Sequence, residues 1–263
     1  MSLTIPQPAG DLVEAGLALR LNVPAYRLDV VEDGVRTHTY RVAVGTPDHP
    51  TPLGDFWVRR IVWNPWWVPP PFEWAENERV TPPGPSNPTG RVKIMFGRYL
   101  FMHGTPAEST LGRAASHGCV RMANADAIEL ARLLQETGSP GVASQEIDSL
   151  VANPKMTRAY ALERPIPFSI EYRLAEIQGE RLEAHPDIYR KGGLTTEAIG
   201  SLLEESGGNP RRLDPVLLDA LLARAAREHV TVRVRDLLGT PSGPDTLSDP
   251  QRPLPSESLS RDP

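Results

Sequence analysis

The sequence predicts a mainly β protein with one helix in its middle and a short helical region near its C-terminal end. Apolar residues alternate from Leu17 to Val30, which is the period-two pattern of half-buried strands. Asp33-Gly34 is a hairpin turn signal between two alternating segments. The chain also contains 28 prolines in 263 residues, roughly twice the average share, which disfavours an all-helical protein.

The remaining elements follow from the same kind of pattern. Tyr40–Val44 and Phe56–Val62 alternate, and strand character returns at residues 92–96 and 99–102. Asn124 is a good N-cap for a helix that runs to about Glu136 and stops at Gly138. Later segments predict a strand pair at 166–173 and 179–183, and helices at 195–205 and 213–228.

The length of 263 residues suits one large domain, or one domain with an appendage. We expect a flexible N-terminus at 1–14, a main domain at 15–175, a strand and helix extension at 176–238, and a disordered tail at 239–263. The tail is rich in Pro, Ser and Asp and has almost no apolar periodicity.

Composition excludes several classes of protein. The 28 basic and 33 acidic residues give a net charge of −5, which argues against a generic nucleic-acid binder. No apolar run reaches the length of a membrane span, and a single cysteine excludes an internal disulfide framework. The first ten residues show no secretory signal. We therefore expect that the protein stays inside the cell, or that its given first residue is not the first residue of an exported precursor.

All five tryptophans lie between Trp57 and Trp74, and the Pro- and Gly-rich residues 81–90 follow them. Proline pairs exclude a helix there, so we expect a long ordered loop. The indoles either plug an edge of the core or form an aromatic wall or lid over a site.

The only thiol, Cys119, stands in the segment Ser116-His117-Gly118-Cys119-Val120-Arg121. A lone cysteine is more often a small buried residue than a nucleophile. Here the preceding glycine permits a tight turn, while the helix expected near Asn124 and the charge of Arg121 favour a thiolate. A cysteine nucleophile is therefore plausible.

Two histidines are candidate bases for this thiol: His117, two residues away, and His103, at the end of a predicted strand. An alternative is a zinc site made of these three residues and a water, although the chain has no HExxH or CxxC element. The other histidines lack a partner pattern and are expected to be surface or structural: His38, His49, His185 and His229.

His103-Gly104-Thr105, a short Gly/Ala/Ser loop and Ser116–Met122 together resemble the active-site signature of the L,D-transpeptidases (YkuD-type catalytic domain). Residues 51–56 resemble the family's threonine-proline-x-glycine segment, and the likeness covers roughly residues 17–175. It implies that residues 15–175 are the catalytic domain, a β-sandwich of mixed sheets with one helix after the cysteine.

The resemblance also implies a role for each site residue. Cys119 would be the nucleophile and His103 the proton donor and acceptor, oriented by the carbonyl of Gly104. Peptide N–H groups of the turn would form an oxyanion hole, and Arg121 would hold a substrate carboxylate. The supporting set is therefore Gly104, Ser116, His117, Gly118 and Arg121, with no metal and no cofactor.

The implied activity is 3→3 cross-linking of peptidoglycan stem tetrapeptides through a cysteine thioester. With water as acceptor the same chemistry gives an L,D-carboxypeptidase, and with a protein lysine it anchors a protein to the wall. A non-catalytic wall-binding protein, with the tryptophan loop holding glycan, is the alternative from another class. The implied partners are donor and acceptor stem peptides, and the implied location is the bacterial cell envelope.

Overall fold

The structure is a computed structural model that describes residues 16–239. The expectations for residues 1–14 and for the tail beyond Gly239 lie outside the described residues. Within them, no helix combines the length and the apolar character that a membrane crossing needs.

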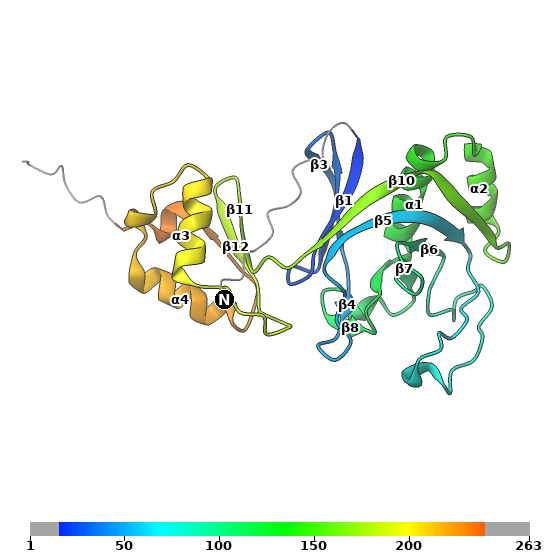
Figure 1. Ribbon diagram of the computed structural model, residues 1–263, viewed down its shortest axis with the longest axis horizontal. Coiled ribbons are helices and arrows are strands. Elements are labelled where there is room, and N and C mark those ends of the chain that lie inside the picture. Colours follow the sequence, from blue (N-terminus) through cyan, green and yellow to red (C-terminus); the bar gives the residue numbers. More distant parts are fainter. Residues whose placement is uncertain (1–15, 240–263) are drawn as a thin grey trace, which may run out of the picture.

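A mixed eight-stranded sheet dominates the molecule, in the order β3-β2-β1-β10-β5-β6-β7-β9 (Figure 1). Pairs β1/β10 and β7/β9 are parallel, and the other neighbours are antiparallel. The mainly β class is therefore confirmed. The strands of this sheet are β1 Leu17–Asn22, β2 Arg27–Glu32, β3 Val35–Arg41, β5 Gly54–Trp63, β6 Val92–Met95, β7 Phe101–Thr105, β9 Val120–Ala123 and β10 Arg158–Glu171.

The N-terminal meander forms as its alternation predicts. Asp33 and Gly34 have φ values of 49° and 80°, and this pair of positive angles matches a two-residue hairpin turn between β2 and β3. The inward residues of β1 and β2, including Leu19, Leu21 and Leu28, are fully or almost fully buried. Local sequence thus determines both the turn and the face that enters the core.

The predicted pairing of 166–173 with 179–183 is wrong. Residues 158–171 form β10, which lies between β1 and β5 in the centre of the large sheet. Residues 181–184 form β12, which pairs with β11 Ala175–Gln178 and with β13 Val230–Arg233 in a separate sheet. Alternation shows that a segment is a strand but does not select a distant partner.

Helix α1, Asn124–Gly138, packs on β6, β7 and β10 with Leu130 and Leu134 in the core. Ala123 is its N-cap rather than Asn124. The Asn124 side chain instead accepts from Arg91 N–H and donates to the Thr105 carbonyl, so it fastens the helix start to the sheet. A second helix, α2 Ser144–Ala152, follows and buries Ile147 and Leu150.

The C-terminal region has its own hydrophobic cluster. There the predicted helices are present as α3 Thr196–Glu205 and α4 Pro215–Ala225, beside the β11-β12-β13 sheet (Figure 1). The first cluster runs from Leu17 to Ile170 and the second begins at Ala175. This division supports the predicted boundary near residue 175, which we retain as a proposal. The short remaining elements are strands β4 Val44–Gly45 and β8 Ala114–Ser116 and 3-10 helices Glu73–Ala75, Glu108–Thr110, Pro210–Arg212 and Val234–Leu237.

Candidate functional site

Strand register brings three charged or titratable residues into one row. Lys93 on β6 lies opposite His103 on β7, which in turn lies opposite Arg121 on β9. Directly opposed side chains share one face of a sheet. The alternate residues of these strands, such as Met102 and Val120, are fully buried on the other face. The row therefore stands on the face of the sheet that is turned away from the core.

His103 is held in one orientation by its neighbour. The ring is only 5% exposed, and Nδ1 lies 2.8 Å from the Gly104 carbonyl oxygen. Because a carbonyl only accepts, Nδ1 carries a hydrogen, and in the neutral ring Nε2 is left with its lone pair. Burial lowers the pKa of His103 to about 3; the Gly104 carbonyl opposes this shift, and the charges of Arg121 and Lys93 add to it. The imidazole is thus a neutral proton acceptor.

A tight turn presents Cys119 just before β9. Gly118 adopts φ of 100°, a conformation that favours glycine. The Ser116 hydroxyl accepts from the Gly118 N–H at 3.2 Å and donates to the Cys119 carbonyl. These two bonds fix the backbone on both sides of the sulfur. The Cys119 thiol donates to the Tyr99 carbonyl at 3.4 Å.

The surroundings of Cys119 favour the neutral thiol rather than the thiolate that the sequence features favoured. Burial raises the pKa of Cys119 to about 11, against the opposing effects of a hydrogen bond with the Phe101 backbone and of the charges on Lys93 and Arg121. Desolvation outweighs these charges because the thiolate loses its hydration. No hydrogen bond among residues 16–239 joins Sγ to a nitrogen of His103. With the thiol pKa raised and the imidazole pKa lowered, the thiol on the turn before β9 and the imidazole on β7 are both neutral at rest.

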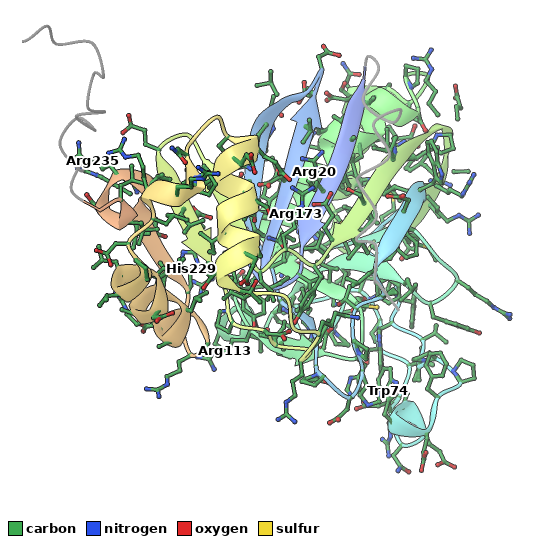
Figure 2. All side chains as sticks on the ribbon, turned by 60° about the vertical axis from the view of Figure 1, so that its left-hand side comes forward. Arg20, Trp74, Arg113, Arg173, His229 and Arg235 are labelled. Atoms are coloured by element: carbon green, nitrogen blue, oxygen red, sulfur yellow. The ribbon has the colours of Figure 1, made fainter. Side chains whose placement is uncertain are left out.

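The tryptophan-rich loop contributes some of its rings to the core and others to the surroundings of the turn that carries Cys119. Trp63 and Trp67 are buried in or beside the core. Trp74 stacks on His117, with ring centroids 4.1 Å apart and an interplanar angle of 7°, and Figure 2 shows it on the loop that projects from the sheet. Phe72 packs edge-on against Tyr99. The loop thus covers the turn that carries Cys119.

His117 has a second aromatic neighbour that the sequence did not reveal. The rings of His49 and His117 lie 4.8 Å apart, and the backbone of residues 49–50 borders Gly118. Partial burial lowers the pKa of His117, and His49 and Arg121 add to the effect. The only available signal was that His49 stands next to the Thr51–Phe56 motif.

Lys93, Tyr99 and Phe101 are further site residues that sequence reasoning missed. The alternation of Val92 and Ile94 already placed Lys93 on the opposite face of its strand. The register that sets it beside His103 is a tertiary property, however, and no local pattern reports it. Arg121 was predicted, and its main chain exchanges hydrogen bonds with Ala43, which anchors β9 from the other side.

Two of the remaining histidines pair with each other. The Nδ1 atoms of His185 and His229 lie 2.9 Å apart and their rings stack, beside a cavity of about 620 Å³ between the two hydrophobic clusters. Figure 2 places His229 in the C-terminal region, well away from Trp74. These two histidines therefore contact each other, which the sequence did not show, and they lie outside the candidate site.

The zinc alternative finds no support in the geometry. Within residues 16–239 no group of three or more His, Cys, Asp and Glu side chains is arranged to hold a metal ion. His103 directs Nδ1 to the Gly104 carbonyl, and His117 stacks on Trp74 with its ring tilted against His49.

Sequence comparisons match this chain to L,D-transpeptidases. Residues 18–145 match the family model of the L,D-transpeptidase catalytic domain, YkuD. The chain is 29% identical over 183 residues to the probable L,D-transpeptidase ErfK/SrfK of Salmonella typhimurium, covering 65% of this chain and 52% of that protein. It is 33% identical over 137 residues to the probable L,D-transpeptidase YbiS of Escherichia coli K12, covering 47% and 44%. The chain thus spans about half the length of these relatives.

Solved structures that match part of this chain include an L,D-transpeptidase from Mycobacterium smegmatis, at 14% identity and a TM-score of 0.37, covering 60% of this chain and 59% of that one. The catalytic domain of an E. faecium L,D-transpeptidase matches at 13% identity and a TM-score of 0.40, covering 60% and 98%.

Proposed function

Residues 18–145 belong to the YkuD family of L,D-transpeptidase catalytic domains, and on that premise we propose that this chain forms 3→3 cross-links between peptidoglycan stem peptides through a thioester on Cys119. The observation that carries this proposal is that the thiol lies on the turn leading into β9 while a neutral, fixed imidazole lies on the adjacent strand β7.

In the first half-reaction the Cys119 thiol gives up its hydrogen bond to the Tyr99 carbonyl and donates to Nε2 of His103 instead. As Sγ bonds to the carbonyl carbon of the third residue of a donor tetrapeptide, Nε2 takes the thiol proton. The C–N bond to the terminal D-alanine then breaks, and Nε2 returns the proton to the leaving amine. Because the thiol has the higher pKa and the imidazole the lower, a preformed ion pair is disfavoured, and the proton moves as the C–S bond forms.

In the second half-reaction a side-chain amine of another stem peptide attacks the thioester. Nε2 of His103 takes a proton from the amine, the C–S bond breaks, and the sulfur leaves as the thiol. The Gly118 N–H is already bonded to Ser116, so we assign the oxyanion to the peptide N–H groups of His117 and Cys119, with Arg121 holding a substrate carboxylate.

The acceptor separates this proposal from its alternatives. Water in place of the amine gives an L,D-carboxypeptidase, a protein lysine gives an anchoring enzyme, and no turnover at all indicates a wall-binding protein. Incubation with purified muropeptides followed by mass spectrometry of the products distinguishes cross-linked dimers, tripeptides and unchanged substrate. The proposed site of action is the bacterial cell envelope.

A carbapenem tests the nucleophile directly. We expect one drug mass to be added to the intact protein, no adduct on Cys119→Ala, and much slower addition on His103→Ala. His38→Ala is the matched control, because His38 lies on β3, outside this site. An adduct that persists on Cys119→Ala would rule out Cys119 as the nucleophile.

A further inference from the structure

We propose that Lys93 is a positioning residue for the Cys119 thiol: its ammonium, held over Phe101 without a carboxylate partner in the described part of the chain, stabilises the negative charge that develops on the sulfur. The inference rests on the proposed role of Cys119 and adds a residue that the active-site motif does not contain.

Two contacts fix the Lys93 ammonium. Nζ lies 5.0 Å from the centre of the Phe101 ring and donates to the Trp66 carbonyl at 3.2 Å. Phe101 itself contacts Cys119 through its backbone, and its ring lies 5.4 Å from that of His103. Phe101 and the tryptophan-rich loop therefore hold the ammonium on the face of the sheet where Lys93 is paired with His103.

The charge of Lys93 is not neutralised locally. None of the ion pairs formed among residues 16–239 includes Lys93. Burial lowers the pKa of Lys93 while Cys119 raises it, and Lys93 in turn opposes the rise of the Cys119 pKa. A partly desolvated cation without a counterion is costly, and a developing thiolate is an anion that would offset this cost.

The other titratable or charged side chains on the elements around Cys119 are His103 on β7, Arg121 on β9 and His117 on the preceding turn. Of these only Arg121 is a permanent cation, and it remains when Lys93 is replaced. Loss of Lys93 is therefore expected to weaken the stabilisation of the thiolate without abolishing it.

The test uses the fact that the chain has a single cysteine. The rate of alkylation by iodoacetamide, measured against pH on the full chain, reports the ionisation of Cys119 alone. We expect Lys93→Met and Lys93→Gln to be alkylated about tenfold more slowly at pH 8, which corresponds to a pKa rise of about one unit. Lys93→Arg should stay within about threefold of the unaltered protein, because the cation is kept.

Lys93→Gln separates charge from hydrogen bonding, because an amide still donates to the Trp66 carbonyl. If Lys93→Met does not fold, Lys93→Gln still tests whether the charge of Lys93 stabilises the thiolate. The matched control is Lys191→Met, which removes a lysine that packs over the Tyr172 ring outside the site, and it should leave the profile unchanged. A Lys93→Gln profile that superimposes on that of the unaltered protein would overturn the inference. Alkylation needs no peptidoglycan chemistry, so this failure is distinct from failure of the proposed transpeptidation.

Discussion

At the scale of single residues, the site depends on a glycine that has little room for a side chain. A Cβ at Gly104 would collide with the Asn124 side-chain oxygen and would lie 3.3 Å from the Arg91 nitrogen. That side chain is itself fixed by its bonds to Arg91 and Thr105. The close approach places the Gly104 carbonyl where it orients His103.

Gly104→Ala should lower the free energy of unfolding by about 1–3 kcal/mol, because the fixed Asn124 side chain cannot move away without losing its hydrogen bonds. Urea unfolding measures the loss. Gly141→Ala is the control, since its new methyl would meet only the Glu163 side chain at 3.7 Å. In an Asn124→Ala background the cost of Gly104→Ala should shrink, and an unchanged cost would show that the strain lies elsewhere.

The low pKa of His103 predicts how stability depends on pH. The folded pKa is about 3 and the unfolded value is about 6.5, so between these values the unfolded chain binds one more proton. Stability should therefore fall as the pH drops below 6.5, by at most about 1.4 kcal/mol per pH unit from this group.

His103→Gln removes that titration and is the comparison for the unaltered protein. The stability difference between the two should shrink from pH 7 to pH 4.5, measured by urea unfolding at several pH values. Glu176, whose pKa is lowered to about 2, contributes a loss only below its unfolded value near 4.5. A constant difference above pH 4.5 would contradict a buried neutral imidazole.

At the scale of elements, the tryptophan-rich loop reaches the site through one ring. Trp74→Ala should remove the cover from His117 and let its pKa rise towards the ordinary value, because burial is the main cause of its depression. An NMR titration of the His117 ring protons measures the shift. Trp57→Ala is the control, since Trp57 lies on β5 with comparable exposure, 39% against 37%. An unchanged His117 pKa would show that the stacking does not shield the ring.

Elements defined by local patterns were predictable, and those defined by distant partners were not. The β2–β3 turn, α1, α3 and α4 follow from glycine, capping and apolar periodicity within the segment itself. The central place of β10 and the contact of Lys93 with the site depend on register between strands that are distant in sequence. Cys119 and His103 could be proposed as site residues because their sequence motifs resemble a family signature, whereas the raised thiol pKa arises from tertiary burial.

At the scale of the whole molecule, Arg27 connects the two hydrophobic clusters. Its guanidinium contacts Asp29 at 3.0 Å, Glu176 at 2.7 Å and Glu183 at 3.0 Å, and only the first of these belongs to the large sheet. The Asn22 side chain also donates to Glu176. The boundary near residue 175 is thus bridged by charges that are largely shielded from water.

Arg27→Met should destabilise the protein by about 3–5 kcal/mol, because it leaves Glu176 and Glu183 without this guanidinium and Asp29 with Arg36 alone. Arg224→Met is the control: its exposed pair with Glu228 within α4 and the following turn should contribute less than about 1 kcal/mol. Thermal and urea unfolding measure both changes. A small effect for Arg27→Met would show that water already solvates the junction.

The central position of β10 has a consequence for biosynthesis. Strands β1, β2 and β3 are synthesised first. In the large sheet, however, they are joined to β5 only through pairing with residues 158–171. Until that segment has been synthesised, one edge of β1 is unpaired and the β1–β3 meander cannot join β5 in the large sheet. Such late, long-range closure is slow and leaves nascent chains prone to aggregate, so heterologous expression should benefit from low temperature and slow translation.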